Sequence, residues 1–249
     1  MKRRPPLGTA LVVFLVSSSA GAYEAPFAPV APIVDGVPGD VAWNKADWRP
    51  IDQPIIGGIP AADDFSGRYK LVWTPNYLFA LAEITDDVLI DARADPLLEY
   101  WNDDALEIFI DEDASGGNHL NDFNAFAYHI ALDNQVVDIA PSEGGTGIPQ
   151  LFNEHVTAVW RRHPDSPNTL YWEVRIAVYR EDRAVSGIPS VLESNKELGF
   201  MVAYCDADSP EGREHFIGDV NIVPVNGDRN RGYIDASVFG RLTLVGTSD

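Results

Sequence analysis

Apolar and polar side chains alternate along many stretches of the chain. The clearest is Tyr100–Asp113, where Leu106, Ile108 and Ile110 alternate with Glu107 and its neighbours. A two-residue period is that of a β-strand with one buried face. The pattern therefore predicts a strand over 104–111. The same kind of pattern predicts seven more strands, over Arg68–Thr74, Tyr77–Ile84, Phe126–Asp133, Glu154–Arg162, Thr169–Val178, Leu198–Asp206 and Gly240–Val245.

The predicted strands are separated by turn-rich segments, and hardly any of the chain has helical periodicity. A proline-asparagine pair at 75–76, between the first two strands of that series, predicts a hairpin. Many short strands joined in this way are typical of an all-β protein. We expect a jelly-roll-like antiparallel β-sandwich.

One short helical segment is expected near the N-terminal end of this fold. Within 35–46, Asp40 stands where a helix cap belongs. Val41, Trp43 and Ala46 follow it at spacings that would turn all three inward.

The first residues have the features of a secretory signal peptide. Basic residues at 2–4 precede an apolar run, Leu11–Val16, and small side chains at 20–22 offer a cleavage pattern. The apolar run is too short to span a bilayer as a helix. We expect cleavage near Ala22, a secreted or periplasmic protein, and no membrane insertion. The expected organisation is a signal peptide over 1–22, a proline-rich lead-in over 23–33 and a single domain over 34–249.

Acidic residues outnumber basic ones by about two to one. The chain has 38 Asp and Glu against 18 Lys and Arg, a net charge of −20. Cleavage would remove three basic residues, so the mature charge would be 15 − 38 = −23. Binding to phosphates needs clustered Lys and Arg. The composition therefore argues against a nucleic-acid partner, and the single cysteine, Cys205, excludes a disulfide within the chain.

Known catalytic motifs are missing from the sequence. It has no G-x-S-x-G elbow, no H-E-x-x-H and no Walker loop. Paired carboxylates can hydrolyse glycosides, but among 38 acidic residues no pair is marked out by its spacing. We expect a non-catalytic protein.

The segment Asp111–Asp122 has the spacing of a calcium-binding loop. Asp111, Asp113 and Asp122 fall at ligand positions, with Gly116 at the sharp turn. The closing residue is Asp instead of Glu, and a strand leads into the loop in place of a helix. The segment is either a calcium site or an acidic surface loop between strands.

Alternation also predicts one polar surface. His129 lies on the polar face of its predicted strand, as Glu107 does on the preceding strand, and Trp101 stands just before the latter. If the two strands pair, a carboxylate and an imidazole lie beside an aromatic ring. Sugars are bound by such sets, with aromatic rings against C–H patches and polar groups on hydroxyls.

Several segments of the chain resemble family 9 carbohydrate-binding modules, the type appended to secreted xylanases. The most specific is WNDDALEIFID, Trp101–Asp111. Weaker matches, in the family's order, are DG…D..W from Asp35, YKLVWTPNYLFALAEITD from Tyr69, YHIALD from Tyr128, YWEVRIAV from Tyr171, LGFMVAYCDAD from Leu198 and FGRLTLV from Phe239.

The resemblance implies a calcium-stabilised β-sandwich that grips the end of a sugar chain between two aromatic rings. By position, the rings would be Trp101 and Tyr233, with Tyr233 standing where the family has Trp. The polar contacts would be Glu107, His129 and Asn230, with His129 in place of the usual Arg. At a position where a Gln would reach the sugar, this chain has Ala203. Among acidic residues, Asp86 and Asp104 match positions that look like calcium ligands.

The expected partners are an oligo- or polysaccharide and a separate glycoside hydrolase. One alternative comes from another class of protein. Similar secreted sandwiches hold a haem between axial side chains, and His129 and Met201 both fall on the non-core face in this interpretation. They would be the axial pair of an electron-transfer protein.

Overall fold

The fold is described from a computed structural model, over residues 23–181 and 187–246. The predicted signal peptide and its cleavage site lie outside these residues. Seventeen elements follow one another along the described chain. They are β1 (Tyr23–Pro26), η1 (Val41–Lys45), β2 (Arg49–Ile51), β3 (Gln53–Ile56), β4 (Phe65–Thr74), β5 (Tyr77–Asp86), η2 (Tyr100–Asn102), β6 (Ala105–Asp111), β7 (Phe126–Ala131), β8 (Val136–Ala140), β9 (Ile148–Leu151), β10 (Val156–His163), β11 (Ser166–Ile176), β12 (Glu197–Asp206), β13 (His215–Gly218), η3 (Ala236–Val238) and β14 (Gly240–Val245).

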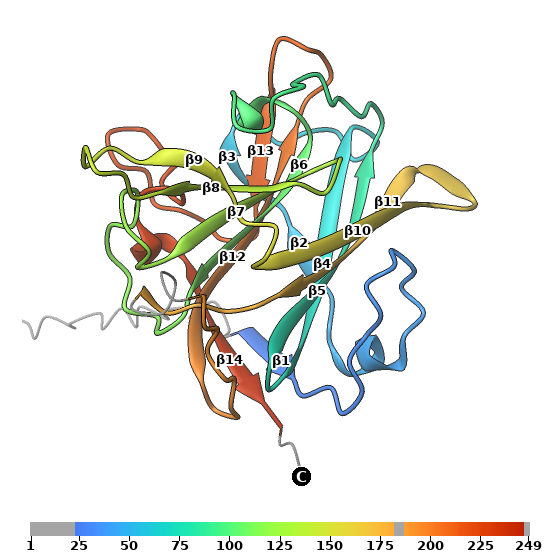
Figure 1. Ribbon diagram of the computed structural model, residues 1–249. Coiled ribbons are helices and arrows are strands. Elements are labelled where there is room, and N and C mark those ends of the chain that lie inside the picture. Colours follow the sequence, from blue (N-terminus) through green and yellow to red (C-terminus); the bar gives the residue numbers. More distant parts are fainter. Residues whose placement is uncertain (1–22, 182–186, 247–249) are drawn as a thin grey trace, which may run out of the picture.

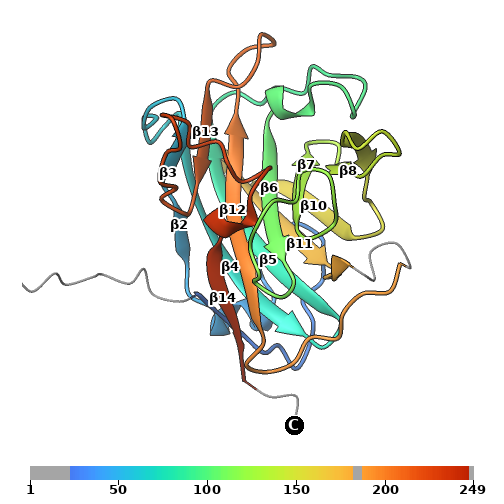
Figure 2. The same ribbon diagram turned by 90° about the vertical axis from the view of Figure 1, so that its left-hand side faces the viewer.

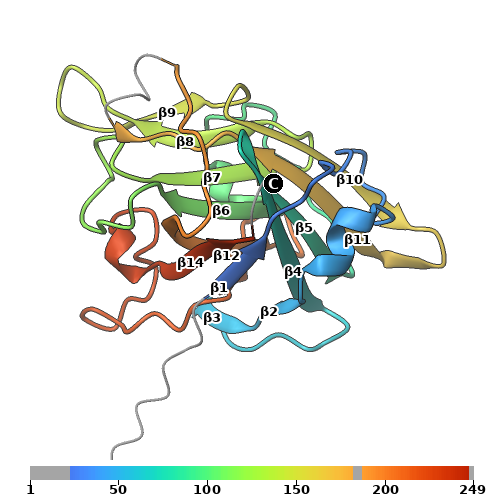
Figure 3. The same ribbon diagram turned by 90° about the horizontal axis from the view of Figure 1, so that it is seen from below.

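The strands form two sheets packed face to face, which confirms the predicted β-sandwich (Figures 1 and 3). The first sheet runs β1-β14-β12-β6-β7-β8-β9, with β13 paired to β12 beyond β14 and β3 paired to β13. The second runs β10-β11-β5-β4-β2. Neighbouring strands are antiparallel except β1, which pairs with β14 in parallel. No helix among the described residues is long and apolar enough to cross a bilayer.

The core lies between the sheets and is filled by the alternating residues that the sequence identified. Leu106, Ile108 and Ile110 of β6 are fully buried in it, opposite Trp172 of β11 and its neighbours. The predicted hairpin at 75–76 is confirmed, since β4 and β5 pair from Thr74–Tyr77 onward. Six short strands, β1, β2, β3, β8, β9 and β13, were not predicted, because each is too short to show a period.

The outer face of the first sheet is covered as well. Phe109, Met201 and Ala203 point away from the core and pack in a second apolar cluster with Ile55, Phe216 and Ile222. The chain between β13 and η3 crosses this face (Figure 2). As a result β6 is buried on both sides, and a polar side chain on its outer face sits at the base of a recess, away from the bulk surface.

The expected helical segment is shorter than predicted and capped differently. It is a 3₁₀ helix, η1, and the side chain of Asp40 makes no cap hydrogen bond. Asp40 Oδ2 instead accepts the Ile33 backbone N–H at 2.8 Å. Trp43 and Ala46 are buried as predicted, but Val41 is 72% exposed. The inward placement of Val41 was wrong because the segment makes too little helical turn to bring three residues to one face.

Part of the segment predicted as a proline-rich lead-in, 23–33, belongs to the sandwich itself. Its first four residues form β1, an edge strand of the first sheet. Pro26 is tolerated there because it stands at the end of an edge strand.

A buried carboxylate fixes the segment around η1 to the second sheet. Glu173, fully buried on β11, accepts the backbone N–H groups of Asp35 and Gly36, each at 3.0 Å, and the Trp43 indole N–H at 2.9 Å. Burial raises the pKa of Glu173 in spite of these hydrogen bonds. Gly36 has φ +76°, and a Cβ there would lie 2.8 Å from Arg161 Cγ, so the turn requires glycine.

We expect Glu173→Gln to destabilise the protein by about 1–3 kcal/mol, because one N–H donor would lose a buried acceptor. Glu83→Gln is the matched control: it removes a carboxylate whose partner, Arg68, is half exposed, and should cost less than about 1 kcal/mol. Urea denaturation measures both. Equal losses for the two variants would contradict the anchoring role of Glu173.

Candidate functional site

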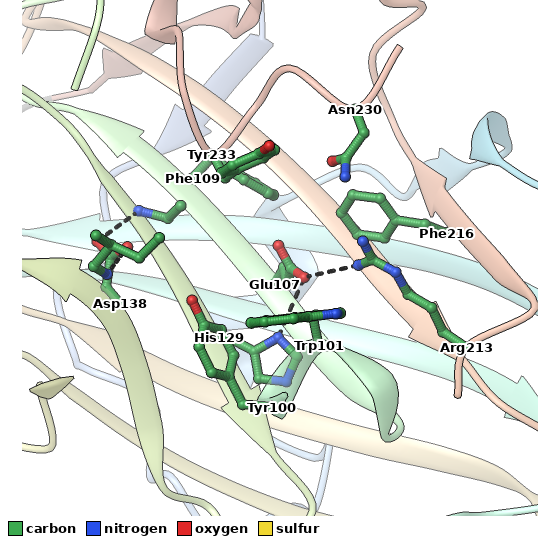
Figure 4. A pocket seen from close by; sticks show the side chains of 12 residues that line it. Tyr100, Trp101, Glu107, Phe109, His129, Asp138, Arg213, Phe216, Asn230 and Tyr233 are labelled. Atoms are coloured by element: carbon green, nitrogen blue, oxygen red, sulfur yellow. Dashed lines mark hydrogen bonds and ion pairs between the residues drawn. The ribbon is translucent and has the colours of Figure 1, made fainter. Parts of the chain in front are cut away.

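A pocket of about 340 Å³ opens on the outer face of the first sheet, a volume typical of small-molecule sites. The structure brings together here all five side chains that the resemblance singled out for sugar binding: Trp101, Tyr233, Glu107, His129 and Asn230 (Figure 4). The other lining residues are Tyr100, Phe109, Ala127, Asp138, Ile139, Arg213 and Phe216.

Two aromatic rings form opposite walls of the pocket. Trp101 and Tyr233 lie across it from each other, with Glu107 between them (Figure 4). Each is 40% exposed, and no other Trp, Tyr or Phe of residues 23–181 and 187–246 is as exposed. Exposing an aromatic ring to water is unfavourable, so two such rings facing one hollow indicate a ligand that covers them.

The Trp101 wall is held in place by buried carboxylates that follow it in sequence. Trp101 lies in η2, at the end of the loop between β5 and β6. Asp103 Oδ2 accepts the backbone N–H groups of Ala92 and Arg93 at 2.9 and 2.7 Å. Asp104 accepts N–H groups of Ile90 and Ala207. The loop is thereby tied to itself and to the end of β12.

The Tyr233 wall is positioned by a histidine from a distant loop. His119 is buried, and its Nε2 lies 2.7 Å from the carbonyl oxygen of Gly232. Burial lowers the pKa of His119, which favours a neutral ring with Nε2–H as the donor. The His119 backbone N–H donates to Ile234 at 2.9 Å. The residues on both sides of Tyr233, Gly232 and Ile234, are therefore both hydrogen-bonded to His119.

The base of the pocket is a carboxylate paired with an imidazole. Glu107 and His129 stand opposite each other on β6 and β7, with His129 Nδ1 3.2 Å from Glu107 Oε1. Burial would raise the pKa of Glu107, but the hydrogen bond and charge of His129, with the charge of Arg213, hold it below its ordinary value. Glu107 is therefore an ionised hydrogen-bond acceptor at neutral pH. His129 Nε2 is buried and has no partner among the described residues.

Three polar lining residues were not predicted. The Tyr100 ring packs edge-on against His129, with centroids 5.1 Å apart. Asp138, on β8, accepts the backbone N–H groups of Ala127 and Ile139, and burial raises its pKa to about 7. Arg213 reaches in from the loop before β13. Only Tyr100, which adjoins Trp101, carried a signal in the sequence.

Two of the predicted metal ligands, Asp86 and Asp104, come together with a third carboxylate. With Asp206 they offer oxygens that all lie within 4.8 Å of one another. All three side chains are buried, and Asp206 Oδ1 has no hydrogen-bond partner in the described part of the chain. Burial and mutual repulsion raise the pKa of Asp86 to about 7 and of Asp104 to about 9.

This carboxylate cluster fits a hard divalent cation such as calcium. Its donors are all oxygens, which calcium prefers, and a bound cation would supply the partner that Asp206 Oδ1 lacks. Asp206 was missed because a single Asp at the end of a strand has many ordinary explanations.

The other three predicted ligands, Asp111, Asp113 and Asp122, belong to no group of three or more converging metal ligands within residues 23–181 and 187–246. Their carboxylates accept backbone N–H groups of their own loop, as Asp111 does from Gly116 at 2.7 Å and Asp122 from Asn124 at 2.9 Å. This geometry is that of a loop closed by its own side chains.

The suggested axial pair for a haem is not formed. Met201 is fully buried beneath Gly232, where an added Cβ would lie 2.7 Å from the Met201 Cε. His129 lines the pocket, but Met201 does not. The two side chains do not face a common space.

Known proteins share this fold and parts of this sequence. The family model described as "Carbohydrate family 9 binding domain-like" matches residues 34–247. A family 9 carbohydrate-binding module from Caldicellulosiruptor kristjanssonii, solved in complex with cellotriose, has a TM-score of 0.65 and 22% identity, covering 91% of this chain and 95% of its own. A family 9 module from the same organism, 21% identical to this chain, has been solved in complex with glucose and also has a TM-score of 0.65.

Curated relatives are much longer enzymes. Endo-1,4-beta-xylanase A of Thermotoga maritima is 22% identical over 219 residues, which is 86% of this chain and 17% of the enzyme. Endo-1,4-beta-xylanase C of Paenibacillus barcinonensis is 31% identical over 121 residues, 49% of this chain and 10% of the enzyme. The match thus covers less than a fifth of either enzyme. Together with the fold, the family model identifies the chain as a member of family 9 of the carbohydrate-binding modules.

Proposed function

We propose that this protein is a secreted or periplasmic, non-catalytic module that binds the end of a sugar chain between Trp101 and Tyr233. The observation that carries the proposal is that these two exposed rings face one pocket with an ionised carboxylate, Glu107, between them. Rings of this kind stack on the C–H faces of sugars, while charged acceptors bind hydroxyls.

Three polar side chains, Glu107, Asn230 and His129, would serve the hydroxyl groups of the bound sugar. Glu107 would accept hydrogen bonds directly, and Asn230, on the far side of the pocket from His129 (Figure 4), can both donate and accept. The Nε2 of His129 is buried, so His129 would act through the Nδ1 hydrogen bond that orients the Glu107 carboxylate. Ala203, directly opposite Glu107 on β12 and fully buried, contributes no hydrogen bond.

Calcium at Asp86, Asp104 and Asp206 would stabilise the module and hold the Trp101 loop. Asp104 bonds to that loop through the N–H of Ile90 and to the end of β12 through Ala207. An ion there would neutralise carboxylates that otherwise repel one another.

In polysaccharide breakdown, such a module would act beside a separate glycoside hydrolase. The support for this is indirect: the curated relatives that carry similar segments include xylanases.

Trp101→Ala is expected to weaken binding of cellobiose or xylobiose at least 10-fold, since losing a stacking wall costs about 1.4 kcal/mol or more. Wild-type dissociation constants should be about 10 µM to 1 mM, measured by calorimetric titration. Trp48→Ala is the control, because Trp48 stacks with Arg68 on the second sheet, away from the pocket. An unchanged affinity in Trp101→Ala, or no heat from any sugar with folded wild type, would refute the proposal.

Removing calcium with a chelator should lower the melting temperature by about 5–10 °C, the effect of an ion present at a hundred times its dissociation constant. Differential scanning calorimetry with and without added calcium measures this. Asp104→Asn should abolish the calcium response, whereas Asp111→Asn should leave it intact. The reverse result would place the ion in the Asp111–Asp122 loop.

A further inference from the structure

Arg213 presents a fixed guanidinium group to the pocket. Its side chain is only 11% exposed. The guanidinium carbon lies 4.6 Å from the centre of the Phe216 ring, and Nη1 donates to Cys205 Sγ at 3.1 Å. A cation stacked on an aromatic ring and held by a buried thiol has little freedom to move. Arg213 is therefore part of the rigid lining.

The guanidinium and the Glu107 carboxylate are neighbours without bonding directly. Nη1 of Arg213 lies 3.8 Å from Oε1 of Glu107, which is beyond hydrogen-bond distance. Figure 4 shows the two groups on adjacent parts of the pocket lining, with the Phe216 ring between the Arg213 guanidinium and Asn230. The two charges leave room for a ligand atom that contacts both.

Both groups also keep free hydrogen-bonding atoms. The protein contacts of the Glu107 carboxylate, from His129, Cys205 and Arg213, all go to Oε1. Within 23–181 and 187–246, Oε2 has no hydrogen-bond partner, and neither do Nε and Nη2 of Arg213. The pocket thus offers an acceptor next to a two-pronged donor.

A sugar hydroxyl fits this arrangement because it donates one hydrogen bond and accepts others. One hydroxyl can donate to Glu107 Oε2 while it accepts from Arg213. The planar fork of a guanidinium can reach a second oxygen on the adjacent carbon. We propose that Arg213 is a specificity-determining residue, which together with Glu107 binds two adjacent hydroxyls of a neutral sugar. This inference rests on the proposed function.

The charges around the pocket favour a neutral sugar over an acidic one as the ligand. Arg213 alone would favour the carboxylate of a uronic acid. The ionised Glu107 stands 3.8 Å from it, however, and Asp138 lines the same pocket. The protein as a whole carries a charge of −20, which repels anions at long range. A uronate would bring a third carboxyl group beside two others.

The test is calorimetric titration of wild type and Arg213→Met with glucose, its monodeoxy derivatives and glucuronic acid. Methionine keeps an apolar stem against Phe216. We expect glucose affinity to fall about 10- to 100-fold, as for loss of hydrogen bonds to a charged group. We also expect the penalty for the deoxy sugars to disappear in the variant at the hydroxyl that contacts Arg213 alone, and to shrink at the hydroxyl that Glu107 also binds. A purely structural role would weaken all the neutral sugars by one common factor.

Arg241→Met is the control, because Arg241 is exposed on β14 and pairs with Glu197. Arg213→Lys keeps the charge and the stem, and it should retain the deoxy penalty at one hydroxyl while losing it at the other. It serves as the test if Arg213→Met unfolds.

Unchanged glucose affinity and deoxy penalties in the Arg213 variants, with binding abolished in Trp101→Ala, would overturn this inference and leave the proposed function standing. Tighter binding of glucuronic acid than of glucose by wild type would overturn the neutral-sugar assignment. Failure of wild type to bind any sugar would overturn both.

Discussion

The pairing of β6 with β7 on one side and β12 on the other is the constraint on which the site depends. In this register Glu107 stands opposite His129 and Ala203, while Leu106 and Ile108 fill the core. A slip by one residue would turn the carboxylate into the core and the leucine into the pocket. Because burying an unpaired carboxylate in the core is costly, the slipped register is disfavoured. The same strand register therefore determines both the packing of the core and the position of Glu107 in the pocket.

The strands supply only the base of the pocket, and its walls come from loops that buried polar groups hold in place. The wall that carries Trp101 depends on the carboxylates Asp103 and Asp104, and the wall that carries Tyr233 depends on His119. This division lets the walls of the site change without a change in the core of the scaffold. It also links stability to binding, because an ion at Asp86, Asp104 and Asp206 would order the loop that carries Trp101.

Sequence reasoning predicted the residues whose position follows from a two-residue period. Glu107 and His129 are of this kind, since strand alternation fixes the face of each and adjacency in sequence suggests their pairing. Arg213 and His119 could not be found this way, because each reaches its place through loop geometry that no local pattern encodes. Val41 was misplaced for a related reason: five residues of 3₁₀ helix are too few for periodicity to decide which side faces inward.

Whether a sugar is held against Trp101 can be observed directly in an NMR titration of the indole N–H signals. The chain has six tryptophans, and Trp43, Trp73 and Trp172 are buried at least 97%. On adding cellobiose, the Trp101 signal should shift and saturate, while the signals of Trp48 and Trp160, on the second sheet, should stay in place. A shift at Trp48 without one at Trp101, or no shift at saturating sugar, would show that Trp101 does not hold the sugar.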